Sequence, residues 1–409
     1  MAKPNNHDLI PKRKDAFNAL KIDPKDRVIL ALDGGGMRGI LTIQLLKKLE
    51  EVAGIPCYEL FDMVAGTSTG GIIAGLIVKG LTAQQIEEKY KDLIDKVFQH
   101  RPLGNRFINP PQFSKKIYRE LLKDIIGATT TLEEACMVHD LDLMITSRDM
   151  SAAEETFFTC FKQKDGKNYH GTYKKVLLRA VMESTMSAPT YFYPLERFVD
   201  GGVTTHNNPS LGAFIEAVTY STPKKDDGSR DPSEYKTPNV TVYSFGTGAT
   251  QRFIKPEKTL DPEGSDIKFW LDWLINETSE DASNVQENTF RSLMIQDSVV
   301  YKRFQISLDP TALKKLNNSG ELDIEIYKTK WLWDLDEHHL GNIDMADMTH
   351  FKLMKIIGEQ MADYIMKHGG AFTRDLAIDG KDELVTFSGD VERIKKQMSD
   401  PGWLDGFQA

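Results

Sequence analysis

Three residues near position 68 have the types and the spacing of a serine nucleophile. Gly66, Ser68 and Gly70, in the stretch GTSTG, give the pattern G-x-S-x-G of a nucleophile elbow. In such a turn between a strand and a helix, a larger residue two places on either side of the serine would collide with the crossing backbone. The turn also places the hydroxyl at the positive end of the following helix. The pattern predicts that Ser68 attacks a carbonyl carbon; the alternative is a serine that only caps a glycine-rich turn.

A second glycine-rich stretch, DGGGMRG at 33–39, is compatible with two kinds of anion site. Its glycines fit the spacing G-x-G-x-x-G of a loop that binds a dinucleotide pyrophosphate: Gly34, Gly36 and Gly39. Such a site needs an acidic residue about 20 positions farther on, at the end of the next strand. Asp62 lies near that distance but precedes the strand end.

The alternative is an oxyanion hole, which stabilises the negative charge that forms when a serine attacks a carbonyl. We favour this interpretation, because a pyrophosphate and an elbow serine would compete for the same crevice. The predicted donors are the backbone N–H groups of Gly34, Gly35 and Gly36.

Ser68 requires a base, and two residues compete for that role. His206 lies close after the stretch DGG at 200–202 and would complete a Ser–His–Asp triad. Asp200 ends an expected strand, and ligands of open α/β sheets bind beyond the carboxyl ends of strands, so its carboxylate would face Ser68. It could take the serine proton directly if burial raises its pKa toward neutrality. Taken alone, Asp-Gly is also a common turn dipeptide.

Alternating strands and helices are expected to bring these turns to one edge of a sheet. Apolar runs at 27–33, 55–66 and 240–248 are typical of buried parallel strands. Helical patterns follow the first two runs, at 38–52 and 70–80. The order strand, helix, strand, helix predicts an α/β fold with a mostly parallel central sheet flanked by helices.

Further short elements follow in the middle of the chain, before its character changes. Short strands are expected at 141–150, 154–163 and 196–203, and a helix at 207–218 with Asn208 at its cap. From about residue 255 the sequence becomes charged and helix-rich, without further glycine-rich chemistry. We therefore expect an N-terminal lead at 1–24, a catalytic domain at 25–250, and a helix-rich extension packed on that domain at 251–409.

The three glycine-bearing blocks together resemble the signature blocks of the patatin-like phospholipases, in the same order. These blocks are DGGGMRG, GTSTG and DGG, with further similarity in SAPTYF (187–192) and SFGTG (244–248). The resemblance covers residues 25–250 and implies a three-layer α/β/α fold. It implies a Ser–Asp dyad without histidine, formed by Ser68 and Asp200, and a basic oxyanion-loop position at Arg38. The remaining motif glycines are Gly39, Gly66, Gly70, Gly201 and Gly202.

The resemblance also implies a function. Members hydrolyse acyl esters of lipids through an acyl-enzyme, so we expect a lipid ester substrate, transient contact with a membrane interface, and no cofactor or metal. The alternatives are an oxidoreductase that binds a nucleotide at the G-x-G-x-x-G loop, and a lipid-binding protein without catalysis. Acyl-chain preference, headgroup preference and any activating signal or partner protein are not predicted.

Composition excludes other classes of protein. The net charge of −9, with no long basic stripe, argues against binding of nucleic acid. Three scattered cysteines lack metal-ligand spacing, and the chain has neither a signal-like start nor a run of 18 apolar residues, so a cytoplasmic protein is expected. Aromatic-rich segments at 266–277 and 328–337 are compatible with a membrane interface, although we expect them to be core.

Overall fold

A seven-stranded sheet occupies the centre of the computed structural model. The structure describes residues 11–98, 113–160, 173–220, 235–248, 282–306 and 346–369, with short stretches between 308 and 343 and between 395 and 402. The strands are β1 (Arg27–Leu32), β2 (Met63–Gly66), β3 (Asp142–Asp149), β4 (Glu154–Thr159), β5 (Phe198–Asp200), β6 (Val240–Phe245) and β7 (Val300–Phe304).

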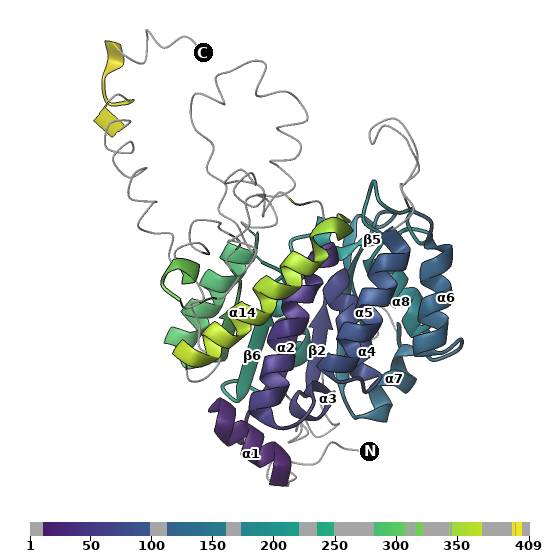
Figure 1. Ribbon diagram of the computed structural model, residues 1–409, viewed down its shortest axis with the longest axis horizontal. Helices are drawn as coiled ribbons and strands as arrows, with labels where there is room; N and C mark the ends of the chain where they lie inside the picture. Colours follow the sequence, from purple (N-terminus) through teal and green to yellow (C-terminus); the bar gives the residue numbers. More distant parts are fainter. Residues whose placement is uncertain are drawn as a thin grey trace.

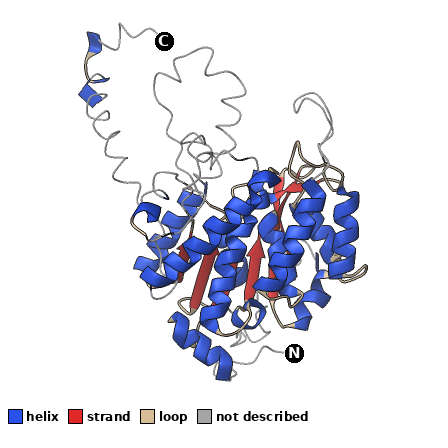
Figure 2. Cartoon of the chain, viewed as in Figure 1, coloured by secondary structure: helices blue, strands red, loops and turns tan. Residues whose placement is uncertain are grey.

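Most of these strands are parallel. Their order is β4-β3-β2-β1-β6-β7, and the four pairs from β3 to β7 are parallel. At the other edge, β4 and the short β5 both pair with β3 in the antiparallel direction. The expected mostly parallel sheet is therefore confirmed, and Figure 2 shows its strands in red behind a row of helices.

Helices cover both faces of the sheet. The α-helices are α1 (Pro11–Leu20), α2 (Gly39–Ala53), α3 (Cys57–Leu60), α4 (Thr69–Val78), α5 (Ala83–Phe98), α6 (Lys115–Ile126), α7 (Leu132–Val138), α8 (Leu178–Thr185), α9 (Ser210–Tyr220) and α14 (Phe351–Gly369). Figure 1 shows α14, α2, α4 and α5 side by side over one face. Short 3-10 helices are η2 (Gly36–Arg38), η3 (Tyr173–Lys175), η4 (Gly201–Val203) and η7 (Met348–His350).

Side chains of β1 show why the sheet needs a layer on each face. Successive residues of a strand point to opposite faces. Val28, Leu30 and Leu32 accordingly pack into the core beneath α2, α4 and α5, whereas Ile29 packs into a second core with Phe214 of α9 and the helical residues 282–295. All six residues of β1 are buried. The chain therefore has the expected three-layer α/β/α architecture.

One expected strand is shorter than the sequence indicates. The apolar run at 55–66 predicts a single strand, but residues 57–60 form the short helix α3 and only residues 63–66 form β2. The Glu50 side chain accepts a hydrogen bond from the backbone N–H of Cys57 at 2.8 Å and so caps the first turn of α3. A side chain of α2 thus stabilises this turn of helix.

The segment after residue 250 adds a strand to the sheet as well as helices. β7 pairs in parallel with β6, with Phe304 opposite Phe245. Helix α14 packs along α2, which connects β1 to α3 (Figure 1). The aromatic-rich segments at 266–277 and 328–337 lie outside the described residues. Over the part of the chain that is described, no helix has the length and apolar composition needed to span a bilayer.

Candidate active site

The turn between β2 and α4 holds Ser68 in a strained backbone conformation. Ser68 has φ of 51° and ψ of −120° and immediately precedes the first residue of α4. A non-glycine residue adopts such angles only when the surrounding structure enforces them. A Cβ atom on Gly66 would lie 2.2 Å from the carbonyl oxygen of Gly70, and a Cβ atom on Gly70 would lie 2.2 Å from that of Leu32. The two glycines thus let the backbone cross as an elbow requires.

Ser68 and Asp200 lie in direct contact. The Ser68 hydroxyl donates a hydrogen bond of 2.6 Å to Oδ2 of Asp200, and the N–H of Gly202 donates one of 2.7 Å to Oδ1. The Asp200 residue is only 4% exposed. Burial raises the pKa of its carboxyl group to about 6, although the hydrogen bonds from Ser68 and Gly202 oppose this shift. A carboxylate with such a pKa is able to accept a proton near neutral pH.

Asp200 reaches this position by a different route from the expected one. We expected Asp200 at the end of a strand whose carboxyl end faces the crevice; β5 ends at Asp200 but runs antiparallel to β3. β3 extends past the end of β2, because Gly66 pairs with Ile145 and β3 continues to residue 149. β5 pairs with this extension, with Asp200 opposite Ser147. The antiparallel β5 thus brings the Asp200 carboxylate beside Ser68.

The glycine-rich loop after β1 lies against Ser68. A Cβ atom on Gly34 would be 3.1 Å from the Cβ of Ser68. The N–H of Gly34 donates to the carbonyl of Asn207 at 3.2 Å. Among the described residues, the N–H groups of Gly35 and Gly36 donate no hydrogen bond. Gly36 has a φ of 55°, in the region that favours glycine. The N–H of Gly34 is therefore occupied, whereas those of Gly35 and Gly36 are not, and Gly36 lines the pocket beside Ser68.

The other motif residues have packing positions. Arg38 ends η2, and its backbone N–H donates to the carbonyl of Gly35 at 3.1 Å. A Cβ atom on Gly39 would lie 2.6 Å from Tyr90 Oη. A Cβ atom on Gly201 would lie 2.2 Å from Thr146 Oγ1. These residues close the turns tightly around the serine. A Cβ atom on Gly202 would lie 3.1 Å from Asp200 Oδ1.

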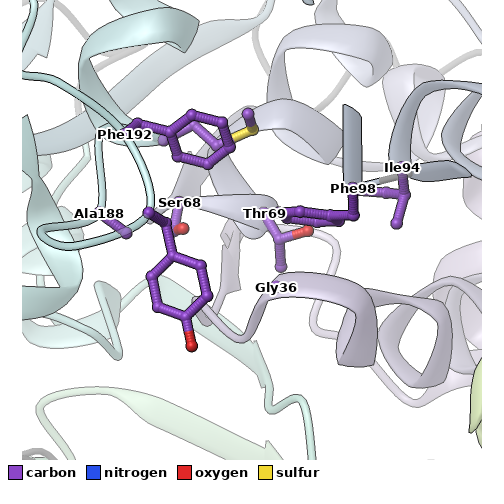
Figure 3. Close-up of a pocket in the computed structure, with 9 residues that line it drawn as sticks. Gly36, Ser68, Thr69, Ile94, Phe98, Ala188 and Phe192 are labelled. Carbon is purple, nitrogen blue, oxygen red and sulfur yellow. The ribbon is translucent and has the colours of Figure 1, made fainter. Parts of the chain in front are cut away.

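An apolar pocket opens beside the serine. Aliphatic and aromatic side chains form most of its wall, and Figure 3 shows the Phe192 ring above Ser68 and the Phe98 ring to its right, beyond Thr69. Phe98 and Phe192 both pack against the Phe113 ring, with centroids 5.1 and 5.8 Å apart. The lining residues are Gly36, Ser68, Thr69, Ile94, Phe98, Met186, Ala188, Tyr191 and Phe192.

His206 and Asp62 have other partners. His206 Nδ1 lies 2.8 Å from Oε2 of Glu155, and its ring packs edge-on against Phe157. The His206 side chain is thus engaged with Glu155, whereas Ser68 bonds to Asp200. Asp62 precedes β2, at the end of the sheet away from the elbow, and forms a buried ion pair of 2.6 Å with Arg27. It is not placed to bind a ribose at the glycine loop.

Several residues that support the site were not predicted from the sequence. Thr185 Oγ1, at the end of α8, accepts a hydrogen bond of 2.7 Å from the Ser68 N–H. The Tyr90 hydroxyl on α5 contacts both the carbonyl of Gly36 and Thr69 Oγ1. The similarity around 187–192 pointed to the segment just after Thr185, but no spacing rule identified Tyr90. Among the described residues, no group of three His, Cys, Asp or Glu side chains is arranged to hold a metal ion.

Comparison with known proteins points to one family. The model of the family described as patatin-like phospholipase matches residues 30–214, which include the glycine loop, Ser68 and Asp200. The 85/88 kDa calcium-independent phospholipase A2 of Mus musculus is 31% identical over 261 residues, which are 59% of this chain and 30% of that protein. The chain spans between 21% and 30% of the length of the first curated relatives.

Bacterial proteins are similar over a larger share of their length. A cGAMP-activated phospholipase of Escherichia coli is 31% identical over 249 residues, which are 57% of this chain and 65% of that protein. Among solved structures, VipD from Legionella pneumophila matches with 12% identity and a TM-score of 0.32, over 94% of this chain and 80% of that one. The curated relatives named here are all phospholipases.

Proposed function

Because the model of the patatin-like phospholipase family matches residues 30–214, we propose that this protein hydrolyses fatty-acyl esters of lipids with a Ser68–Asp200 dyad. The observation that carries the proposal is the 2.6 Å hydrogen bond from Ser68 Oγ to Asp200 Oδ2 at the edge of an apolar pocket. It joins a nucleophile to a base whose pKa burial raises to about 6.

In the first half of the proposed reaction, Ser68 Oγ attacks the acyl carbonyl carbon while Asp200 takes the hydroxyl proton. The carbonyl oxygen becomes an oxyanion, which the N–H groups of Gly35 and Gly36 and the N-terminus of α4 stabilise. The bond to the alcohol oxygen then breaks, and Asp200 returns the proton to the leaving alcohol. The acyl group remains as an ester on Ser68.

In the second half, water replaces the alcohol. Asp200 takes a proton from the water as its oxygen attacks the acyl carbonyl, and the same donors stabilise the second oxyanion. The Ser68–acyl bond breaks, the proton passes to Ser68 Oγ, and the fatty acid leaves. One oxyanion-hole donor typically accounts for about 10²–10³ in kcat.

The surroundings of the dyad favour a lipid substrate. The pocket wall of Ile94, Phe98, Met186 and Phe192 suits an acyl chain, because contact with these side chains removes apolar surface from water. Tyr193, which follows this wall, is 60% exposed. A lipid substrate requires transient contact of this side of the protein with a lipid interface.

Covalent labelling tests the proposal. The purified protein is incubated with a fluorophosphonate probe, and its activity is measured on p-nitrophenyl butyrate and on phospholipid vesicles. We expect a single probe adduct, mapped to the Ser68 peptide by mass spectrometry. Ser68→Ala should remain folded and lose both labelling and ester hydrolysis. Full activity in Ser68→Ala, or an unlabelled and inactive native protein, would contradict the proposal.

Two further variants distinguish a dyad from a triad. Asp200→Asn should lose at least about 10³-fold in kcat/KM, because an amide cannot accept the serine proton. His206→Ala should keep most of its activity, because the His206 ring is engaged with Glu155. If His206→Ala is as inactive as Ser68→Ala, a histidine base replaces the dyad.

A further inference from the structure

A buried ion pair lies at the base of the glycine loop. Asp33 directly precedes Gly34 and is 4% exposed. Both of its carboxylate oxygens accept hydrogen bonds from Arg303: Nη1 donates to Oδ1 at 2.8 Å and Nη2 to Oδ2 at 2.6 Å. This two-pronged arrangement fixes the direction of the carboxylate as well as its distance. The loop therefore begins at a residue whose side chain has a fixed position.

Arg303 is itself held in place by the sheet. It lies in β7, opposite Ser244 of β6, and Nη1 also donates to the Ser244 hydroxyl at 2.8 Å. The Nε atom is 3.3 Å from Oε1 of Glu287. Arg303 is 7% exposed. β7 follows Ser68 by more than 200 residues in the chain. The side chain of its Arg303 thus extends past β6 to Asp33, just after the end of β1.

A second contact from the same part of the sheet holds the next residue of the loop. Thr247 Oγ1 donates to the carbonyl of Gly34 at 2.8 Å, just after β6. The N–H of Gly248 in turn donates to Gln305 Oε1 at 2.9 Å, just after β7. The Asp33 carboxylate is therefore bound to Arg303 of β7, and the Gly34 carbonyl is bound to Thr247, which follows β6.

We propose that Arg303 is a positioning residue for the oxyanion hole: its paired hydrogen bonds to Asp33 set the direction in which the N–H groups of Gly35 and Gly36 point. The inference rests on the proposed function, since it assigns a role within the same reaction. Gly35 and Gly36 have no side chains through which neighbours could hold them. Their carbonyl groups accept hydrogen bonds from the Arg38 N–H and the Tyr90 hydroxyl, and Asp33 sets the direction in which the chain enters the loop. Displacement of a catalytic group by about 1 Å is able to cost about 10²-fold in rate.

The test compares Arg303, whose partner Asp33 follows β1, with Arg27, the first residue of β1. Arg303→Lys keeps the positive charge but cannot make two parallel hydrogen bonds to one carboxylate. Arg27→Lys makes the same change in the buried pair of Arg27 and Asp62, where β1 begins. Both variants are compared with the native protein by thermal melting, by kinetics on p-nitrophenyl butyrate, and by inhibition with an alkyl trifluoromethyl ketone. The ketone adds to Ser68, so its oxygen becomes an anion in the oxyanion hole.

We expect Arg303→Lys to lose at least about tenfold in kcat with KM changed less than about twofold, and to weaken ketone inhibition by a similar factor. Arg27→Lys should lower the melting temperature comparably and keep kcat within about twofold. Equal kcat in the two variants, or an unchanged kcat in Arg303→Lys, would overturn the positioning role. If the native protein is active and is labelled on Ser68, either of these two outcomes leaves the proposed function intact.

A neutral pair covers the case in which Arg303→Lys does not fold. Asp33→Asn/Arg303→Gln removes both charges of the buried Asp33–Arg303 pair together with the two-pronged bond. Glu287 loses its contact with Arg303, but its side chain is 23% exposed and stays in contact with solvent. We expect this double variant to fold and to show the same loss of kcat and of ketone inhibition. If it folds with native kcat, or if neither variant folds, the ion pair is structural and the proposal fails.

Discussion

Asp200 meets two opposing requirements at the scale of a single residue. Removal from water disfavours its charged form, yet the proposed reaction needs a carboxylate that accepts the proton of Ser68. Burial raises its pKa to about 6, and the hydrogen bonds from Ser68 and Gly202 limit the rise. The residue is therefore both a stronger base than an exposed aspartate and a destabilising element of the folded protein.

The first prediction at this scale concerns the rate. The free enzyme should require ionised Asp200, so kcat/KM should fall about tenfold per pH unit below pH 6 and level off above it. A pH profile on p-nitrophenyl butyrate measures this limb. A limb near pH 4, the range of an exposed aspartate, would contradict the assignment of Asp200 as base.

The second prediction concerns stability. The pKa of Asp200 is about 6 in the folded protein, against an unperturbed value of 3.8 that applies to the unfolded chain. As pH rises, the Asp200 carboxyl group therefore loses its proton in the unfolded chain first. Native stability should therefore decrease between pH 4 and pH 6, by about 3 kcal/mol from this group. Asp200→Asn lacks this penalty, so its unfolding free energy relative to the native protein should increase over that interval. Urea titrations from pH 4.5 to 8 test it, and a constant difference would contradict it.

At the scale of elements, the elbow depends on how closely α4 approaches β1. A Cβ atom on Gly70 would lie 2.2 Å from the Leu32 carbonyl oxygen at the end of β1. That atom belongs to backbone within the sheet and cannot move aside. Gly75, on the same helix, faces the flexible end of the Met182 side chain, where a Cβ atom would lie 2.7 Å from the sulfur.

These two glycines form a matched pair for mutation. We expect Gly70→Ala to lower the free energy of unfolding by about 3 kcal/mol, because the backbone must shift to relieve the clash. Gly75→Ala should lower it by less than about 1 kcal/mol, because Met182 adjusts and alanine favours the helix. Urea unfolding of both variants measures the difference. Equal losses would show that crowding at the elbow is not specific to the crossing with β1.

At the scale of the whole molecule, residues beyond 250 contribute to the sheet that carries the site. β7 covers the edge of β6, and α14 packs along α2 (Figure 1). Arg303 also supplies the partner of the buried Asp33. The boundary expected at residue 250 stays a prediction, and these contacts indicate how to test it.

Shortening the chain after residue 250 should prevent cooperative folding. It removes Arg303 from a buried pair, a loss that typically costs about 3–5 kcal/mol, and it exposes an unpaired strand edge. We expect the shortened chain to lack a sharp thermal transition by circular dichroism under conditions where the full chain melts cooperatively. A sharp transition in the shortened chain would show that residues up to 250 fold independently.

The sequence by itself determined the local chemistry of this protein. The glycines around Ser68 and after β1 are steric requirements of tight turns, and such requirements act between near neighbours in the chain. The apolar runs likewise predicted buried strands and the α/β fold, because burial selects side chains along each element. The order of the three motif blocks carried the resemblance to the family.

Only the tertiary structure decided which distant groups meet. The antiparallel direction of β5, the occupation of the Gly34 N–H by Asn207 and the pairing of His206 with Glu155 depend on contacts between remote segments. The same holds for the ion pair of Arg303 and Asp33. The sequence does not predict it, because the two residues meet only when β7 pairs with β6. Hydrogen bonds and ion pairs form at contact distance, and the distance between two remote residues is set by the packing of the whole sheet.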